Sequence, residues 1–250
     1  MTKLEERVVL VTGGSRGIGR AITLRFASSG TRLFINFFQN RTAAEKTAED
    51  AISCGAKVHL LQADLKDQEQ IRGMFREVER LYGRLDVLIH NAASGVLRSI
   101  LELTAKHWNW VLDTNARSLL LCAREAASMM HEGGRIISLS SNGSSRVIPQ
   151  YGAIGISKAA LESLTRYLAV ELAPKGITVN AVSAGAVATE IWSLIPDGQE
   201  ILEKIRERTP SGRLLNPEDV AAIVYFLASP QAQMIQGQVI VVDGGYSLIA

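Results

Sequence analysis

The sequence predicts an α/β fold: a single doubly wound domain with a parallel seven-stranded sheet and helices on both faces. Short apolar runs alternate with longer helical patterns along the 250 residues, and this alternation indicates βαβ units. The short runs are nearly continuous in aliphatic residues, as expected of strands buried on both faces. The composition, 47% hydrophobic and 21% charged, suits one large core and gives no sign of a second domain.

Each strand is predicted where β-branched or aliphatic residues form a short run. In chain order, the expected strands are Arg7 to Val11, Arg32 to Phe37, Lys57 to Ala63, Asp86 to His90, Arg135 to Ser140, Thr178 to Val182 and Gln238 to Val242. The expected helices lie near Gly17 to Ser29, Thr42 to Ser53, Gln68 to Leu81, Lys106 to Met130, Gly152 to Leu172 and Pro217 to Ala228. The stretch from Ala186 to Arg213 lacks strand character and is predicted to be a substrate-binding lid, because long loops in compact domains are usually functional or disordered.

The charge balance gives no reason to expect nucleic acid or membrane binding. Lys and Arg number 27 against 25 acids, a formal net charge of +2, and no apolar run is long enough to span a bilayer. Cys54 and Cys122 have no paired spacing and no signal peptide precedes Val8, so we expect a reducing, cytoplasmic compartment. The four histidines, His59, His90, His107 and His131, lack ligand spacing, and no metal site is predicted.

A glycine-rich segment, Thr12-Gly13-Gly14-Ser15-Arg16-Gly17-Ile18-Gly19, follows the first strand and opens a helix. Glycine at such a turn lets the backbone approach a pyrophosphate, and the helix N-terminus offers free N–H groups and a positive dipole end. A tight turn without a ligand is the alternative, but the strand–turn–helix context favours a dinucleotide. The expected contacts in this turn are Gly13, Ser15, Arg16, Gly17, Ile18 and Gly19.

The residues about 20 positions after the glycine-rich segment determine whether NAD or NADP is preferred, because an acid there would bind the adenosine ribose of NAD. The segment from Asn36 to Arg41 contains no Asp or Glu. Arg16 and Arg41 could instead pair with a 2′-phosphate. We therefore expect NADPH, with Asn36 and Arg41 among the residues that bind it; a solvated position at a helix start is the alternative for Arg41.

Tyr151 and Lys158 are separated by six residues. If Tyr151 is helical, seven residues rise about 10.5 Å against about 6 Å for four, so the hydroxyl could start about 4.5 Å farther from the lysine than in a pair four apart. Such an offset suits a 2-enoyl thioester, in which hydride goes to Cβ and charge collects on the thioester oxygen. Ser141 lies 17 residues before Lys158 and keeps a second reading open, because a serine there could polarise a ketone; it could also be a loop hydroxyl.

These motifs resemble the short-chain dehydrogenases/reductases, whose usual tyrosine would fall at Ile154. Within that family the chain is most similar to the enoyl-(acyl-carrier-protein) reductase III group. The resemblance rests on the Tyr151-x6-Lys158 spacing, on the segment Asn91-Ala92-Ala93-Ser94-Gly95-Val96-Leu97-Arg98, on His107-Trp108-Asn109-Trp110, and on the ending from Gly237 to Gly245. It implies a Rossmann-type fold, NADPH as cofactor and a homotetramer.

The resemblance also implies roles for single residues. Lys158 would bind the nicotinamide ribose and lower the pKa of Tyr151, and Asn115 would bend the long helix and support a water-linked proton path. Asp64, followed by Leu65, would bind the adenine, with a helix cap as the alternative role for Asp64. Further cofactor contacts are expected at Asn91, Ala92, Gly185, Val187 and Thr189.

The expected activity is NADPH-dependent reduction of the 2,3-double bond of trans-2-enoyl thioesters, as in fatty acid synthesis, with Tyr151, Lys158, Ser141 and Asn115 as catalytic residues. A carbonyl reductase such as a 3-oxoacyl-acyl-carrier-protein reductase, and a non-catalytic NADP(H)-binding regulator, are the alternatives.

Apolar lid residues (Ile191, Trp192, Leu194, Ile195, Leu202 and Ile205) could cover an acyl chain or belong to a packed amphipathic helix. Basic residues nearby (Lys204, Arg206, Arg208 and Arg213) could receive an acyl carrier protein or be solvated. Apolar residues on several faces of the Gly152 to Leu172 helix (Leu161, Leu164, Leu168 and Val170) favour a homotetramer.

Overall fold

A computed structural model describes residues 6–189, 192 and 197–249. Seven parallel strands form one sheet in the order β3-β2-β1-β4-β5-β6-β7. The strand bounds are β1 Val8–Val11, β2 Arg32–Phe37, β3 Lys57–Gln62, β4 Val87–His90, β5 Arg135–Ser141, β6 Thr178–Ala184 and β7 Val239–Val242. The strand order reverses between β1 and β4, so the carboxyl ends of these two strands mark the crevice in which doubly wound proteins bind their ligands.

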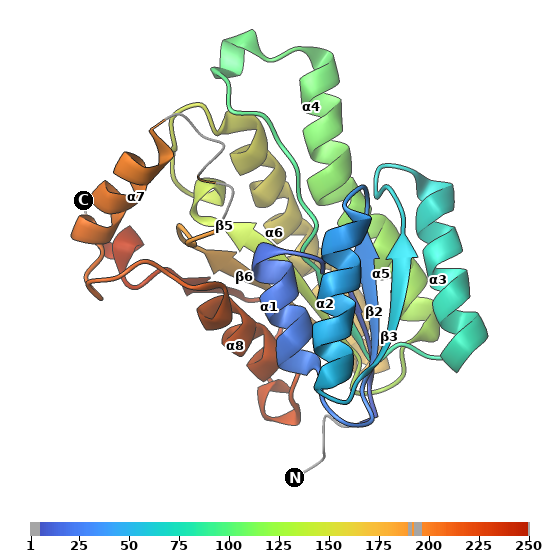
Figure 1. Cartoon of the computed structure of the whole chain (residues 1–250). Helices are drawn as coiled ribbons and strands as arrows, with labels where there is room; N and C mark the ends of the chain where they lie inside the picture. Colours follow the sequence, from blue (N-terminus) through green and yellow to red (C-terminus); the bar gives the residue numbers. More distant parts are fainter. Residues whose placement is uncertain (1–5, 190–191, 193–196, 250) are drawn as a thin grey trace.

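Helices cover both faces of the sheet (Figure 1). Their bounds are α1 Gly17–Phe26, α2 Arg41–Ser53, α3 Gln68–Tyr82, α4 Ala105–Leu112, α5 Ser118–Met129, α6 Gly152–Leu172, α7 Gly198–Arg208 and α8 Pro217–Leu227. One core lies between the sheet and α3, α5 and α6, and a second lies between the sheet and α1, α2 and α8. In β1, Val8 and Leu10 enter the first core while Val9 and Val11 enter the second. Burial on both faces explains the nearly continuous apolar runs, and the predicted fold class is confirmed.

The predicted helix from Lys106 to Met130 is interrupted. Residues Asp113–Arg117 form a π-helical turn, η2, between α4 and α5. In this turn the backbone N–H of Ser118 donates to the carbonyl of Asp113, five residues back, instead of four. The apolar periodicity predicts the helical segments on both sides but is too coarse to show a single added residue.

Other boundaries differ by a few residues. The strand expected to end at Val182 continues to Ala184, because Ser183 and Ala184 pair with both β5 and β7. The first helix ends at Phe26 instead of Ser29. Inside the predicted lid the chain forms α7, whose Leu202 is buried, so the amphipathic-helix reading holds for this part; Ile191, Leu194 and Ile195 lie outside the described residues.

Among the described residues, no helix is long and apolar enough to cross a membrane. The same residues contain no group of three or more His, Cys, Asp or Glu side chains that could hold a metal ion.

Candidate active site

In the turn between β1 and α1, glycine residues leave the backbone accessible to a ligand. Gly13 and Gly17 have positive φ angles of 60° and 52°, which side chains rarely allow. Among the described residues, a Cβ added to Gly17 would meet only the Thr189 methyl, 3.7 Å away, so none of them closes the space beside it. The N-terminus of α1 has no side-chain cap and no acid in its first turn. Its free N–H groups can therefore receive a phosphate.

The loop after β4 is tied to this turn. The Thr12 hydroxyl accepts the N–H groups of Asn91 and Ala92 at 3.0 and 3.1 Å, and the Asn91 amide donates to the carbonyls of Thr12 and Gly13, both at 3.0 Å. A Cβ at position 19 would lie 2.1 Å from the Gly13 oxygen, so only glycine fits there. These bonds bring together the two strand ends that flank the crevice.

Asn36 shapes the same turn from inside. Its side chain is buried; it accepts the Gly13 N–H at 3.3 Å and donates to the carbonyls of Leu61 and Ala63. These contacts direct the amide into the protein. We therefore assign it to positioning the turn, whereas the sequence predicts a cofactor contact.

The two arginines of the expected phosphate site differ in their surroundings. Arg16 is exposed at the start of α1 and forms no ion pair with another described residue. Arg41 is the first residue of α2; its guanidinium lies over the Phe37 ring and pairs with Glu45 at 3.6 Å. Arg16 is thus the freer of the two to meet an anion.

The other predicted cofactor residues lie around this edge of the sheet. Asp64 follows β3 and pairs with Lys66, while Asp67 caps α3; the alternative of Asp64 as the helix cap is therefore wrong. Ser15, Leu65 and Val187 are buried, and Ile18 packs partly against the second core. Gly185 lies so close to Asp243 that a Cβ there would approach within 2.8 Å.

Tyr151 is the residue that precedes α6, with φ −92° and ψ 6°, so it lies at the helix start and outside its regular part. Its hydroxyl donates to the Ser141 hydroxyl at 3.4 Å. Burial raises the pKa of Tyr151, and the bond to Ser141 offsets this in part. The phenol therefore stays protonated near neutral pH and can donate a hydrogen bond.

Lys158 is buried in α6, and its ammonium donates to the Leu139 carbonyl at 2.7 Å. Burial lowers the pKa of Lys158 to about 8, against the opposing effect of Glu162. The sequence-based expectation that Lys158 lowers the pKa of Tyr151 is not met, because the pKa of Tyr151 is raised and its causes are burial and Ser141. The amine still has donors left for a ligand.

Asn115 is fully buried in the π turn. Its oxygen accepts the Ser94 N–H at 2.8 Å, and its amide donates to the Ser94 carbonyl and the Ser157 hydroxyl, both at 2.9 Å. Asn115 thus joins the loop after β4 to α6 beside Lys158. The long helix changes to the π register at this residue, where the sequence predicts a bend.

Ile154 occupies the position nearer to Lys158 and points at Gly95. A Cβ on Gly95 would lie 2.3 Å from the Ile154 side chain, so the loop after β4 passes directly over it. Position 154 is therefore filled by hydrocarbon that donates no proton, and the tyrosine hydroxyl of this helix end comes from position 151.

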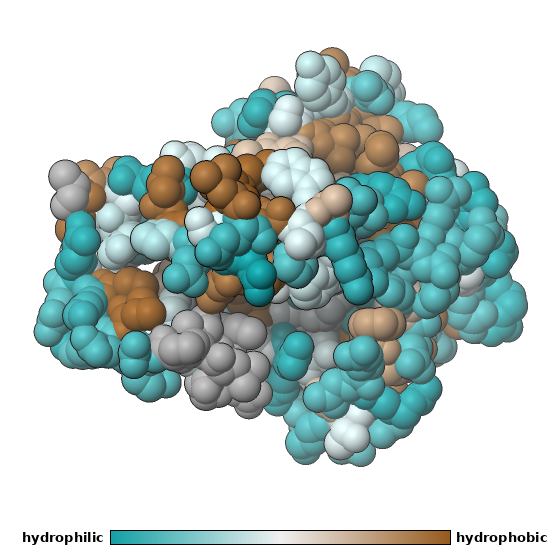
Figure 2. Space-filling view, turned by 90° about the horizontal axis from the view of Figure 1, so that it is seen from above, coloured by the Kyte–Doolittle hydropathy of each residue, from teal (hydrophilic) through white to brown (hydrophobic). Residues whose placement is uncertain are grey.

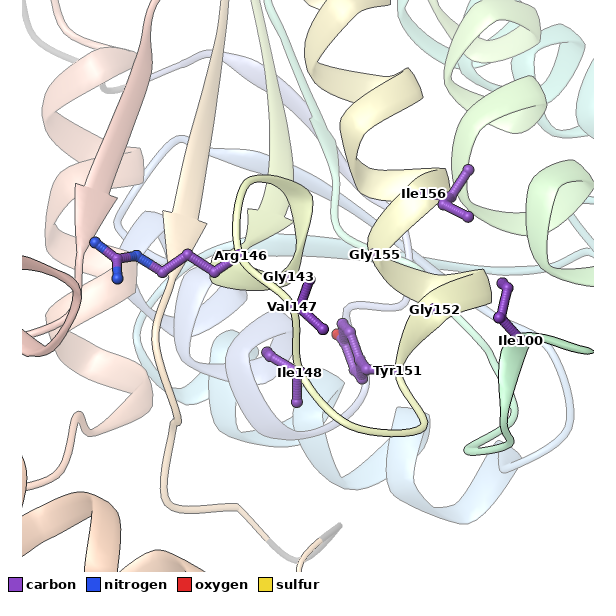
Figure 3. A pocket seen from close by; sticks show the side chains of 9 residues that line it. All are labelled: Ile100, Gly143, Arg146, Val147, Ile148, Tyr151, Gly152, Gly155 and Ile156. Carbon is purple, nitrogen blue, oxygen red and sulfur yellow. The ribbon is translucent and has the colours of Figure 1, made fainter. Parts of the chain in front are cut away.

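A pocket of about 240 Å³ opens beside Tyr151. Its walls come from η1 (Ile100–Glu102), from the segment after β5 and from the start of α6; the lining residues are Ile100, Gly143, Arg146, Val147, Ile148, Tyr151, Gly152, Gly155 and Ile156. Figure 3 shows Ile148 and Tyr151 on one side, Ile100 and Ile156 on the other, and the Arg146 side chain extending away. Seen from above, apolar side chains gather on this end of the molecule between polar margins (Figure 2).

Three basic side chains in and after α7 form local ion pairs. Lys204 pairs with Glu200, Arg206 with Glu203, and Arg213 with Asp219. Arg208 lies over the Tyr246 ring. These pairs reduce the charge that α7 could present to an acidic carrier.

Sequence reasoning missed the residues that hold the site in shape. Gly143 lies against the Tyr151 ring, where a Cβ would approach two ring carbons to 2.6 Å. Ser157 and Ser94 bind Asn115, and Thr12 joins two loops. The position of Ser157 directly before Lys158, and of Gly143 two residues after Ser141, were the only available signals.

The fold and this constellation define a doubly wound dinucleotide-binding protein with a tyrosine and a lysine beside the crevice. A family model described as Enoyl-(Acyl carrier protein) reductase matches residues 13–247. A 1-cyclohexenylcarbonyl-CoA reductase of Streptomyces collinus is 37% identical over 246 residues, 98% of this chain and 88% of that protein. An NADPH-dependent aldehyde reductase 2 of Arabidopsis thaliana, described as chloroplastic, is 37% identical over 97% of this chain and 94% of that one.

The solved structure of a short-chain dehydrogenase from Burkholderia cenocepacia in complex with NADP superposes with a TM-score of 0.90, at 33% identity, covering 98% of this chain and 100% of that one. The chain belongs to the short-chain dehydrogenase/reductase family and is an oxidoreductase.

Proposed function

We propose that this protein reduces the 2,3-double bond of trans-2-enoyl thioesters with NADPH, in fatty acid synthesis or a related acyl pathway. The observation that carries the proposal is the placement of the tyrosine hydroxyl at position 151, with Ile154 filling the nearer position against Gly95. A 2-enoyl thioester accepts hydride at Cβ and needs a donor at the thioester carbonyl oxygen, which is three bonds from Cβ. A ketone needs the donor next to the attacked carbon.

The pocket beside Tyr151 suits an acyl substrate, because its walls are mostly aliphatic. The Streptomyces collinus relative is named for 1-cyclohexenylcarbonyl-CoA, a thioester whose name places a double bond next to the carbonyl. Both observations support an unsaturated thioester. An acyl carrier protein as the natural carrier is part of the proposal.

The residues around the crevice fit a nicotinamide dinucleotide. The open space at Gly17, the uncapped start of α1 and the exposed Arg16 favour a phosphate-rich ligand, and the segment from Asn36 to Asn40 places no acid against a 2′-phosphate. The residues proposed to hold NADPH are Gly13, Ser15, Arg16, Gly17, Ile18, Gly19, Arg41, Asp64, Leu65, Asn91, Ala92, Lys158, Gly185, Val187 and Thr189, with Asn36 supporting the turn. When bound, the reduced nicotinamide supplies the hydride.

The chain's own residues then act on the substrate. The neutral Tyr151 hydroxyl donates a hydrogen bond to the thioester oxygen as negative charge develops there. Ser141 holds the hydroxyl, and Lys158 adds positive potential. Asn115 fixes α6 to the loop after β4, which keeps Lys158 and Ile154 in place.

One observation favours a second candidate. Tyr151 and Ser141 are within 3.4 Å, and two hydroxyls so placed could polarise a ketone oxygen together. The Arabidopsis thaliana relative, an aldehyde reductase by name, agrees with carbonyl chemistry.

Initial rates of NADPH oxidation with a trans-2-enoyl thioester and with the matching 3-ketoacyl thioester separate the two candidates. We expect at least tenfold higher kcat/KM for the enoyl substrate, about 1.4 kcal/mol in transition-state stabilisation. Preference for the ketone would establish the carbonyl reductase instead. NADPH binding without turnover of either substrate would indicate a cofactor-binding regulator.

A further inference from the structure

A buried polar chain connects the end of β4 to the π turn that carries Asn115. His90, Ser118 and Asn115 are all fully buried. The His90 Nε2 lies 2.7 Å from the Ser118 hydroxyl, and that hydroxyl donates to the Thr114 carbonyl at 2.5 Å. None of these contacts belongs to the cofactor turn or the substrate pocket.

The π turn explains why the Thr114 carbonyl needs this partner. In an α-helix the N–H of Ser118 would bond to the carbonyl of Thr114, four residues back. Here that N–H bonds to the carbonyl of Asp113, so the π register takes away the usual donor of Thr114. The Ser118 side chain replaces it. A part-buried carbonyl without this replacement would lose part of its hydration with no hydrogen bond in return.

The hydrogen count fixes the role of His90. Ser118 has one hydroxyl proton and gives it to Thr114, so its oxygen can only accept from His90. His90 therefore carries a proton on Nε2. Its Nδ1 has no hydrogen-bond partner among the described residues. Burial of the ring and, to a smaller extent, the charge of Lys158 disfavour a second proton, and they lower the pKa of His90 to about 3, so the ring is neutral.

We propose that His90 is a positioning residue, which holds residues 113–117 in the π register through Ser118 and thereby places Asn115 between the loop after β4 and α6. The proposal uses Asn115 as a member of the site and in that respect rests on the proposed function. Without the Ser118 hydroxyl the α register gains in relative stability, because it returns a backbone donor to the Thr114 carbonyl. Without His90 the hydroxyl loses the hydrogen bond that orients it toward Thr114. Asn115 then loses its alignment with Ser94 and Ser157.

The test uses variants that separate hydrogen bonding from bulk. Ser118→Ala removes the relay oxygen, and His90→Leu removes the donor. His90→Gln keeps an N–H donor at a reach similar to that of Nε2, whereas His90→Asn, equally polar, ends one bond short. We expect kcat to fall about tenfold in Ser118→Ala, His90→Leu and His90→Asn, with an unchanged KM for NADPH, and to stay within about threefold of the wild type in His90→Gln.

A background variant shows whether His90 acts through Asn115. In Asn115→Ala, adding His90→Leu should cost no further activity, because groups that act as a unit are not additive. An equal further loss in that background, or full activity in both His90→Leu and Ser118→Ala, would overturn the proposal. If His90→Leu does not fold, Ser118→Ala takes its place in the same comparison, because it removes only one oxygen atom from a helix.

The register itself is read from crystal structures of Ser118→Ala and His90→Gln. An α-helical 113–117 in the first and a π turn in the second are expected; a π turn in Ser118→Ala would contradict the proposal. The kinetics use whichever thioester, enoyl or ketoacyl, the wild type turns over. Failure of the proposed substrate therefore leaves this test intact, and the crystal structures decide it even without turnover.

Discussion

Gly143 illustrates how a residue without a side chain can control the tyrosine. Because a Cβ there would lie 2.6 Å from two carbons of the Tyr151 ring, Gly143→Ala must displace the ring. Misplacement of a catalytic group by about 1 Å can cost up to about a hundredfold in rate, so we expect kcat to fall between tenfold and a hundredfold.

Gly73 is the matched control for this substitution. It lies inside α3, and its nearest neighbour for a Cβ is the Arg76 guanidinium at 3.7 Å. Gly73→Ala should leave kcat unchanged and stabilise the protein by about 0.5–1 kcal/mol in urea unfolding. Equal kcat in both variants would show that Gly143 does not position the ring.

Substitution of Arg16 tests whether the protein uses NADPH. The wild type should prefer NADPH to NADH by at least tenfold in kcat/KM, about 1.4 kcal/mol, because residues 36–41 contain no acid and Arg16 is exposed beside the turn. Arg16→Ala should lose most of this preference without affecting NADH. Arg25→Ala, in the last turn of the same helix, should retain it. Equal use of both cofactors by the wild type would contradict the assignment.

The contact between β4 and the π turn also predicts how stability depends on pH. The pKa of His90 is lowered from 6.5 to about 3 in the folded chain, so the unfolded chain binds the extra proton first as the pH falls. Neutral His90 therefore makes its full contribution to the free energy of unfolding above about pH 6.5. Below that pH the contribution decreases, and at pH 5 it is smaller by about 2 kcal/mol. Urea unfolding at pH 5 and pH 7.5 should show this difference for the wild type and a smaller one for His90→Gln. The same pH dependence in both proteins would exclude His90 as the cause.

The elements that the sequence predicts well are those with a strong, regular pattern. Helix α6 has the predicted bounds, and the strands of the sheet follow their aliphatic runs. The π turn could not be located, because one added residue in a helix leaves the apolar periodicity on both sides unchanged. Asn115 was the available signal, since it lies within the π turn.

The site was predicted less completely than the fold for a physical reason. Sequence motifs point to groups that would meet a ligand, such as Tyr151, Lys158 and Arg16. The residues that hold these groups, among them Gly143, Ser157 and His90, act through contacts between distant segments. Asn36 is the opposite case. Its position in the sequence predicts a ligand contact, but its side-chain amide points into the protein and forms hydrogen bonds there.

At the scale of the whole molecule, we propose a homotetramer. Two of the leucines on which this expectation rests, Leu161 and Leu168, are buried in the core, but Tyr167 and Val170 on α6 are 67% and 76% exposed. Apolar side chains so exposed favour an interface between copies of the chain.

Val170→Asp should therefore reduce the molar mass measured by light scattering at micromolar concentration. Ile52→Asp, at an exposed apolar position on α2 across the sheet, is the control and should not. A wild-type monomer would refute the proposed assembly.

If the hydroxyl at position 151 donates to the oxygen of an enoyl thioester, kcat for NADPH oxidation should respond strongly to Tyr151→Phe. This substitution removes one oxygen and leaves the ring beside Gly143. With a trans-2-enoyl thioester, kcat should fall by about a hundredfold or more, the scale for losing one preorganised donor to a developing oxyanion. Full enoyl activity in Tyr151→Phe would contradict this role of the hydroxyl.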